Sequence, residues 1–348
     1  MHQQILRVMI ESAVDKGLYG VKTDLKRTVR NLTDLGDYFA KGRFQKDFFR
    51  IAQKMLANEN SPYYELISGI TCNVDHNIIK NFGINIGLNS WTDGARQIRE
   101  YEKDNGYNIP WTIVFDFQNK VEDPLTLLEI AEIIQQGKKI GIYSYMFFIN
   151  CDADYIDELL EVFRKNPECA FIVYTYSNSL TEEHAHKLRE YGNTIVSICI
   201  DNFNISSEFS QAIKILLENK CLFGVHLKYD DNNAGIILNE NWIKQIMELH
   251  CTFAFLIKSA DCSLETEKAI SSYIKNAKTN QKYPIFLIDF YEDIAHVDRN
   301  ISTESCFFKI LYDGTVLSTK ENITTGFKTR DAQLTEILSQ IMPKVNYL

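Results

Sequence analysis

The sequence predicts an α/β protein: a partial or full (β/α) barrel with a helical region before it and a small hairpin and helix after it. Two observations carry this prediction. From Asn108 onwards, strand-like runs rich in Val, Ile, Phe and Tyr alternate with amphipathic helical runs, and the series has no break at its midpoint. Strands that are apolar on both faces are typical of parallel sheets covered by helices. One long unbroken series favours a barrel over a doubly wound sheet.

The strands and helices of this series are read from apolar periodicity. The expected strands are 111–117, 140–149, 170–176, 194–201, 222–229, 252–258 and 284–290. The helices expected between them are 124–137, 154–165, 181–190, 207–219, 239–249 and 263–278. Asp154, Thr181 and Ser263 precede helical runs and are expected to act as N-caps.

The rest of the chain divides into two flanking regions, which gives three segments in all. Residues 1–106 are expected to be helical, 107–302 to form the barrel, and 303–348 to form a hairpin followed by a helix at about 331–341. Asp313 and Gly314 lie between two short apolar runs. An Asp-Gly pair tolerates the positive φ of a tight turn and therefore predicts the hairpin.

Composition excludes several classes of protein. The net charge is −9 and the basic residues are spread along the chain, so a nucleic-acid partner is not expected. No apolar stretch approaches the length of a membrane span, and the first residues lack the apolar run of a signal peptide. We therefore expect a cytoplasmic protein without a membrane partner.

The eight cysteines are scattered, and no two lie within four residues of each other. A single loop that wraps a metal or cluster needs a CxxC or CxxxCxxC group, which this sequence lacks. Four of the cysteines adjoin apolar strand-like runs, where a buried hydrophobic role is expected. These four are Cys169, Cys199, Cys221 and Cys251.

Several stretches resemble bacterial radical S-adenosylmethionine (radical SAM) proteins, including SPASM-like relatives. The stretch 108–117 resembles the entry into their first barrel strand, and 134–143 resembles their first helix and second strand. Shorter matches occur at 166–171, 222–224 and 288–290. The resemblance extends over nearly the whole chain and implies a TIM-like (β/α) barrel of the radical SAM type.

The catalytic signatures of that family are missing from this sequence. In the family, a CxxxCxxC loop after the first strand holds a [4Fe–4S] cluster, whereas the loop 117–124 contains no cysteine. Ile149 and Asn150 stand where the family has a GGEP-like motif that receives the cosubstrate. Cysteines for an auxiliary cluster are also absent from the matching C-terminal places. The resemblance therefore predicts a degenerate form with no [4Fe–4S] cluster, no other cofactor and no metal.

Polar residues at the expected strand ends are the candidate binding residues, because the carboxyl ends of parallel strands converge in a barrel. His226 and Lys228 alternate on one strand and face the same side. If that side is the barrel interior, they can meet Asp201 and perform acid–base chemistry. A satisfied internal polar network is the competing interpretation. The candidates are Asp116, Asn150, Asp152, Thr175, Asn178, Asp201, His226 and Lys228; for Asp152, a role as helix cap is the alternative.

Three hypotheses for function follow. In the first, the chain is a cluster-less pseudoenzyme that acts as a binding or regulatory partner of an active radical SAM paralogue, or of its peptide or protein substrate. In the second, it is a divergent enzyme that performs non-redox acid–base or ligand chemistry at the barrel mouth, with an S-adenosylmethionine-like ligand as one option. In the third, it is a purely structural subunit.

Overall fold

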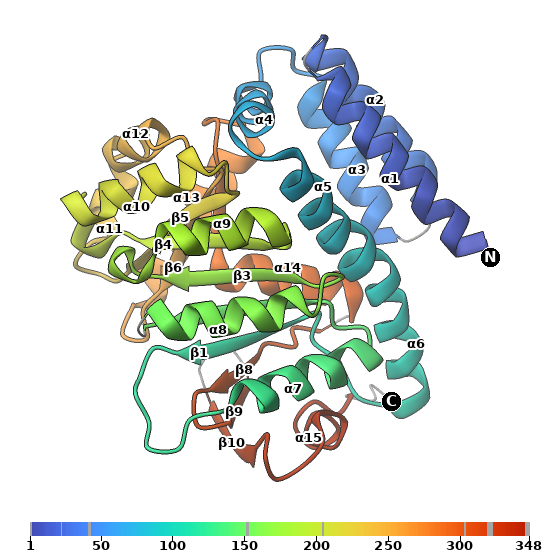
Figure 1. Ribbon diagram of the computed structural model, residues 1–348, viewed down its shortest axis with the longest axis vertical. Helices are drawn as coiled ribbons and strands as arrows, with labels where there is room; N and C mark the ends of the chain where they lie inside the picture. Colours follow the sequence, from blue (N-terminus) through green and yellow to red (C-terminus); the bar gives the residue numbers. More distant parts are fainter. Residues whose placement is uncertain are drawn as a thin grey trace.

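The structure, a computed structural model, describes residues 2–21, 23–40, 43–150, 153–203, 205–302, 304–318 and 323–344. Within these ranges it forms one ten-stranded sheet in the order β10-β9-β8-β1-β2-β3-β4-β5-β6-β7 (Figure 1). Strands β1 to β7 run parallel to one another, and β8 pairs in parallel with β1. The predicted α/β class with a curled parallel sheet is confirmed.

The seven predicted barrel strands are all present, and each lies within its expected range. They are β1 Thr112–Phe117, β2 Ser144–Ile149, β3 Ala170–Thr175, β4 Thr194–Cys199, β5 Phe223–Tyr229, β6 Phe253–Lys258 and β7 Phe286–Asp289. The largest difference is at β2, which begins four residues later than expected because the chain first makes a turn through Gly141 at φ 97°.

The helices between these strands cover the outer face of the sheet. They are α7 Leu127–Lys139, α8 Ala153–Arg164, α9 Glu182–Tyr191, α10 Ser207–Glu218, α11 Ala234–Leu238, α12 Asn241–Glu248 and α13 Leu264–Thr279. Thr181 and Ser263 cap α9 and α13 as predicted, by accepting hydrogen bonds from the backbone. The cap predicted at Asp154 is wrong, because α8 already begins at Ala153.

Side chains of the parallel strands alternate between the helices and the barrel interior. Phe147 and Phe171 point outwards, and Phe171 stacks on Phe163 of α8 with ring centroids 4.0 Å apart. Phe148 follows Phe147 in β2, and Tyr174 lies three residues after Phe171 in β3. Both point inwards, and their rings stack with centroids 4.4 Å apart. Both faces are therefore buried, as the continuous apolar runs predict.

The barrel is partial, and a helix that the sequence analysis did not assign fills its open side. Within the described residues β7 and β8 do not pair. Helix α14 (Phe290–Ile301) follows β7 directly, and Asp289 caps it by accepting from the backbone of Glu292. Phe290 contacts Phe148 and Tyr174 with ring centroids 5.2 and 5.6 Å away. The predicted strand 284–290 therefore ends one residue early, and an aromatic side chain of α14 packs into the interior.

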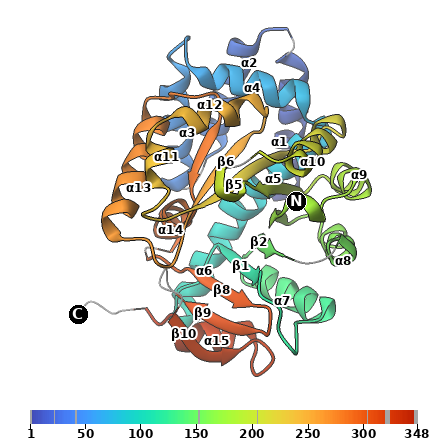
Figure 2. The ribbon, with the colours of Figure 1, turned by 90° about the vertical axis from the view of Figure 1, so that its left-hand side faces the viewer.

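The C-terminal elements extend the sheet beyond β8. The predicted hairpin is present as β8 (Phe308–Leu311) and β9 (Thr315–Ser318), with Gly314 at φ 83°. A strand that the sequence analysis missed, β10 (Ile323–Lys328), pairs with β9, and α15 (Leu334–Ile341) follows. These elements lie together at the bottom of both views (Figures 1 and 2).

The N-terminal region is helical, as predicted. Its helices are α1 His2–Gly20, α2 Leu25–Phe39, α3 Arg43–Leu56, α4 Pro62–Asn73, α5 His76–Ile84 and α6 Ala95–Asn105. Ser61 caps α4, and Pro62 is its first residue. A ten-residue π-helix, η1 (Asn85–Gly94), joins α5 to α6. None of the helices in the described part of the chain is long and apolar enough to cross a membrane.

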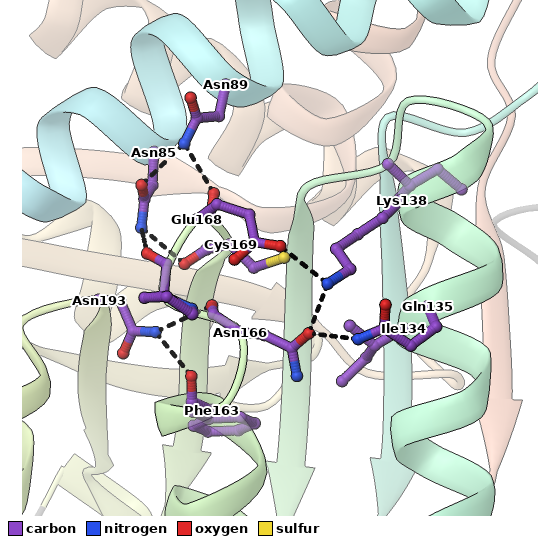
Figure 3. Close-up of polar contacts among 12 residues, drawn as sticks. Asn85, Asn89, Ile134, Gln135, Lys138, Phe163, Asn166, Glu168, Cys169 and Asn193 are labelled. Atoms are coloured by element: carbon purple, nitrogen blue, oxygen red, sulfur yellow. Dashed lines mark hydrogen bonds and ion pairs between the residues drawn. The ribbon is translucent and has the colours of Figure 1, made fainter.

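Two asparagines of η1 attach the helical region to the base of the barrel (Figure 3). Asn85 donates from its amide to the carbonyl oxygens of Pro167 and Cys169, each at 2.8 Å, in the turn that leads into β3. Asn89 donates to the carbonyl of Glu168 at 2.8 Å. Buried backbone carbonyls need such partners, so these bonds fix the position of η1 at the amino-terminal ends of the strands.

A second contact between η1 and the barrel is a close approach of two glycines. Gly94 ends η1 and Gly141 lies in the turn before β2. A Cβ atom on Gly94 would lie 2.4 Å from the carbonyl oxygen of Gly141, and one on Gly141 would lie 2.6 Å from that of Gly94. Only glycine permits two backbones to come this close.

We predict that Gly94→Ala lowers the free energy of unfolding by about 2–3 kcal/mol, because overpacked buried sites cost about this much. Urea denaturation followed by circular dichroism measures the change. Gly83→Ala is the matched control. A Cβ at the exposed Gly83 meets open space, so helix propensity should leave stability unchanged or raise it by up to about 1 kcal/mol. Equal effects of the two substitutions would contradict the close approach.

Candidate functional site

The candidate site is the barrel mouth, where the carboxyl ends of the parallel strands converge. Asp116, near the end of β1, forms an ion pair with Lys309 of β8, with Nζ and Oδ2 3.2 Å apart. The side chains are only 17% and 8% exposed, respectively. A lysine at such depth needs a counter-charge, since an unpaired buried charge is costly. The pair therefore secures Lys309 inside the barrel.

Two further side chains extend this pair across the mouth. Gln118 donates from Nε2 to Asp116 at 3.2 Å, and Lys228 of β5 donates from Nζ to the Gln118 side-chain oxygen at 2.7 Å. Strands β1 and β5 are not neighbours in the sheet. Contact between them therefore requires the sheet to curl so that the bond crosses the interior. We call the four residues Lys309, Asp116, Gln118 and Lys228 the mouth bridge.

His226 lies two residues before Lys228 on the same face of β5, as the sequence predicts, but deeper in the barrel. It is 4% exposed, its Nδ1 is 3.1 Å from the Ser197 hydroxyl of β4, and its ring meets Tyr174 edge to face. Burial, with a smaller contribution from the charge of Lys228, lowers the pKa of His226 to about 3. The imidazole is therefore neutral at physiological pH and is a weak base.

Asp201 occupies a short 3-10 turn, η3 (Asp201–Phe203), and is exposed. The described hydrogen-bond partner of His226 is Ser197, not Asp201. Burial raises the pKa of the Cys199 thiol to about 11, with a further contribution from the negative charge of Asp201. The expected meeting of Asp201 with His226 and Lys228 is therefore replaced by separate contacts: His226 bonds β4, and Lys228 bonds the loop after β1.

The remaining predicted site residues lie apart from the mouth bridge. Asn150 is exposed just after β2, and Asn178 is exposed in the turn η2 (Ser177–Ser179) after β3. Thr175 is buried at the end of β3, one residue after the inward-facing Tyr174, and so faces the outer helices. Asp152 lies outside the described residues. Of the eight candidates, Asp116, Lys228 and His226 are the ones with side chains that the structure places in the interior or across its mouth.

The sequence analysis missed Lys309, Gln118 and Ser197 as parts of the mouth. Lys309 could have been predicted from the sequence, because a charged residue within the apolar run 307–311 needs a buried partner. Nothing in the sequence marks Gln118 as part of the mouth, since glutamine is common in loops. Tyr291 of α14 was also missed; burial and the charge of Asp116 raise its pKa to about 12.

The cysteines gather mainly at the opposite end of the barrel from the mouth. Cys169, Cys221, Cys251 and Cys306 are buried and lie at or just before the amino-terminal ends of β3, β5, β6 and β8. Burial raises the pKa of the Cys221 and Cys251 thiols to about 12, which disfavours the thiolate that binds metal. In the described ranges, no group of three or more His, Cys, Asp or Glu side chains is arranged to hold a metal ion.

Comparisons with known proteins identify the fold. No family model matches the sequence, and no curated protein matches it. The structure is similar to crystal structures of SuiB from Streptococcus suis. The form bound to S-adenosylmethionine aligns with a TM-score of 0.53 and 11% identity over 71% of this chain and 68% of SuiB. The form bound to the precursor peptide SuiA aligns with the same score and identity over 71% of this chain and 69% of SuiB.

This chain therefore shares the fold of SuiB over 71% of its length. It has this fold without a CxxxCxxC group anywhere in its sequence. At 11% identity the likeness defines the architecture and leaves the activity to be argued from the residues at the mouth.

We predict that His226 makes the folded protein less stable in acid. Its folded pKa of about 3 lies below its ordinary value of 6.5, so below pH 6.5 the unfolded chain takes up a proton that the folded chain refuses. Its contribution to the free energy of unfolding is therefore constant above pH 6.5 and becomes more unfavourable as the pH falls towards 3. His226→Asn, which keeps a partner for Ser197, should flatten this part of the profile measured by urea denaturation.

His250→Asn is the control for this experiment. His250 is exposed at φ 54°, a conformation that Asn tolerates, so its replacement should leave the slope unchanged. NMR titration gives an independent reading. A ring signal of His226 that titrates between pH 6 and 7 would contradict its burial in a dry interior.

Proposed function

We propose that this chain is a non-radical protein with a radical SAM fold that binds a peptide or protein at its barrel mouth. In this role it serves an active radical SAM enzyme or the peptide substrate of one. The observation that carries the proposal is the mouth bridge. Gln118 lies in the loop after β1, where the sequence resemblance places the cluster-binding cysteines, and its side chain joins Asp116 to Lys228.

The chemistry of the mouth opposes an iron–sulfur cluster. Such a cluster is held by several thiolates on one loop. Here the loop contributes the Gln118 amide, which accepts a hydrogen bond from Lys228 of β5, and Lys309 of β8 pairs with the neighbouring Asp116. The Cys199 thiol has a raised pKa because it is buried, and the charge of Lys228 also influences it. The carboxylate, amide and ammonium groups present largely satisfy one another. They do not supply the soft thiolate ligands that an iron–sulfur cluster needs.

Binding of a peptide agrees with the outer part of the mouth. Lys228 is exposed and pairs only with a neutral amide among the described contacts. Asn150, Asn178 and Asp201 add exposed polar groups on successive strand ends. The crystal structure of SuiB with its precursor peptide SuiA supports a peptide as the class of partner. Acid–base catalysis is the weaker alternative, because it needs His226 to titrate near neutrality.

The absence of a cluster is tested by anaerobic reconstitution. The purified full-length chain is incubated with iron and sulfide, desalted, and examined by absorption and EPR spectroscopy, with an intact radical SAM enzyme treated in parallel. We expect far less than one cluster per chain, because the loop 117–124 supplies no thiolate. A stoichiometric [4Fe–4S] signal would overturn the proposal.

Peptide binding is tested by selecting binders from a random peptide library displayed on phage and measuring their affinity by fluorescence anisotropy. Lys228→Glu should weaken a mouth-binding peptide by at least about tenfold, which corresponds to about 1.4 kcal/mol. Lys244→Glu on α12 is the matched control, because Lys244 is also exposed but lies outside the mouth. The proposal fails if no peptide is selected, or if both variants bind every selected peptide as well as the unaltered chain.

A further inference from the structure

A second candidate binding site lies at the other end of the barrel, between the helical region and the amino-terminal ends of the strands. It is a cavity of about 740 Å³. Helices α1, α4 and α5 provide one wall, while α9 and the turn before β5 provide the other. Figure 1 shows α5 between α1 and α9. The lining residues that bear on the argument are Tyr19, Cys72, Asp75, His76, Arg189 and Lys220.

The charged groups of this cavity leave it positive. Arg189 pairs with Asp75, with Nε and Oδ2 3.1 Å apart, so those two charges cancel. Lys220 has no ion pair with any residue of the described chain. The backbone of this exposed lysine is fixed beside Asp75, because its carbonyl accepts a hydrogen bond from the backbone of Asp75 at 2.9 Å. A positive cavity on a chain of net charge −9 favours an anionic ligand.

An aromatic side chain borders the same cavity. Tyr19 is 69% exposed, and its ring meets that of His76 edge to face, with centroids 5.9 Å apart and an angle of 80° between the planes. An exposed tyrosine held in this way offers a flat surface on which a planar ring can stack. The volume of the cavity lies in the range of about 300–1,000 Å³ that small-molecule sites occupy.

We propose that this cavity binds a small aromatic anion. The planar ring of the ligand stacks on Tyr19, and its phosphate or carboxylate is bound by Lys220 with Arg189 beside it. Such a ligand contacts α1 and α5 on one side and α9 on the other, so its binding stabilises the attachment of the helical region to the barrel. The proposal is independent of the mouth, because the two sites lie at opposite ends of the strands.

Isothermal titration calorimetry on the full-length chain tests the proposal with two probes, adenosine 5′-monophosphate for a phosphorylated ring and 4-hydroxybenzoate for an aromatic carboxylate. Adenosine, which has the aromatic ring without the charge, and inorganic phosphate, which has the charge without the ring, are titrated for comparison. We expect at least one of the two probes to bind more tightly than either half. Lys220→Glu should weaken that probe by at least about tenfold, because it replaces an attraction by a repulsion.

The matched control is Lys275→Glu, the same charge change at an exposed lysine of α13 that does not line the cavity. Tyr19→Ala, at a position exposed enough to tolerate truncation, should weaken the same probe. Tighter binding of one probe than the other identifies the class of anion. The proposal is overturned if neither probe binds at millimolar concentration, or if Lys220→Glu has no larger effect than Lys275→Glu.

Discussion

Side chains alternate along parallel strands that are covered on both faces, and this alternation decides which residues face the outer helices and which face the barrel interior. Successive residues must point to opposite sides of a strand. Phe147 therefore packs against the outer helices and Phe148 packs inside the barrel. The same alternation places His226 and Lys228 together on the inner side of β5. A shift of one residue in any strand would exchange the two faces.

This constraint produces an interior that is packed rather than hollow. Phe148, Tyr174 and Phe290 occupy its middle, with ring centroids 4.4 to 5.6 Å apart. Lys309 and Asp116 lie at the mouth, where they neutralise each other and Gln118 connects them to Lys228. Polar groups that satisfy one another are stable in a low-dielectric interior.

The two ends of the barrel have different roles. In Figure 1 the arrow of β3 points towards the mouth, while α5 and α6 lie at the other end of the strands. The helical region is attached at that base by Asn85, by Asn89 and by the contact of Gly94 with Gly141. These contacts stabilise the attachment of the helical region at the base, whereas the loops at the opposite end are where barrels place their catalytic residues.

The strands, most of the helices, the hairpin at Gly314 and the lack of a CxxxCxxC group can all be read from the sequence, because each depends on local periodicity or spacing. The sequence also placed His226 and Lys228 on one side of β5, since alternation needs no tertiary information. The tertiary structure alone decided that Gln118 meets Lys228 and that Phe290 fills the barrel, because these contacts join segments that are distant along the chain. It also decided that His226 bonds Ser197 and not Asp201: which of two nearby polar groups reaches a buried ring depends on strand register, which no single stretch of sequence specifies.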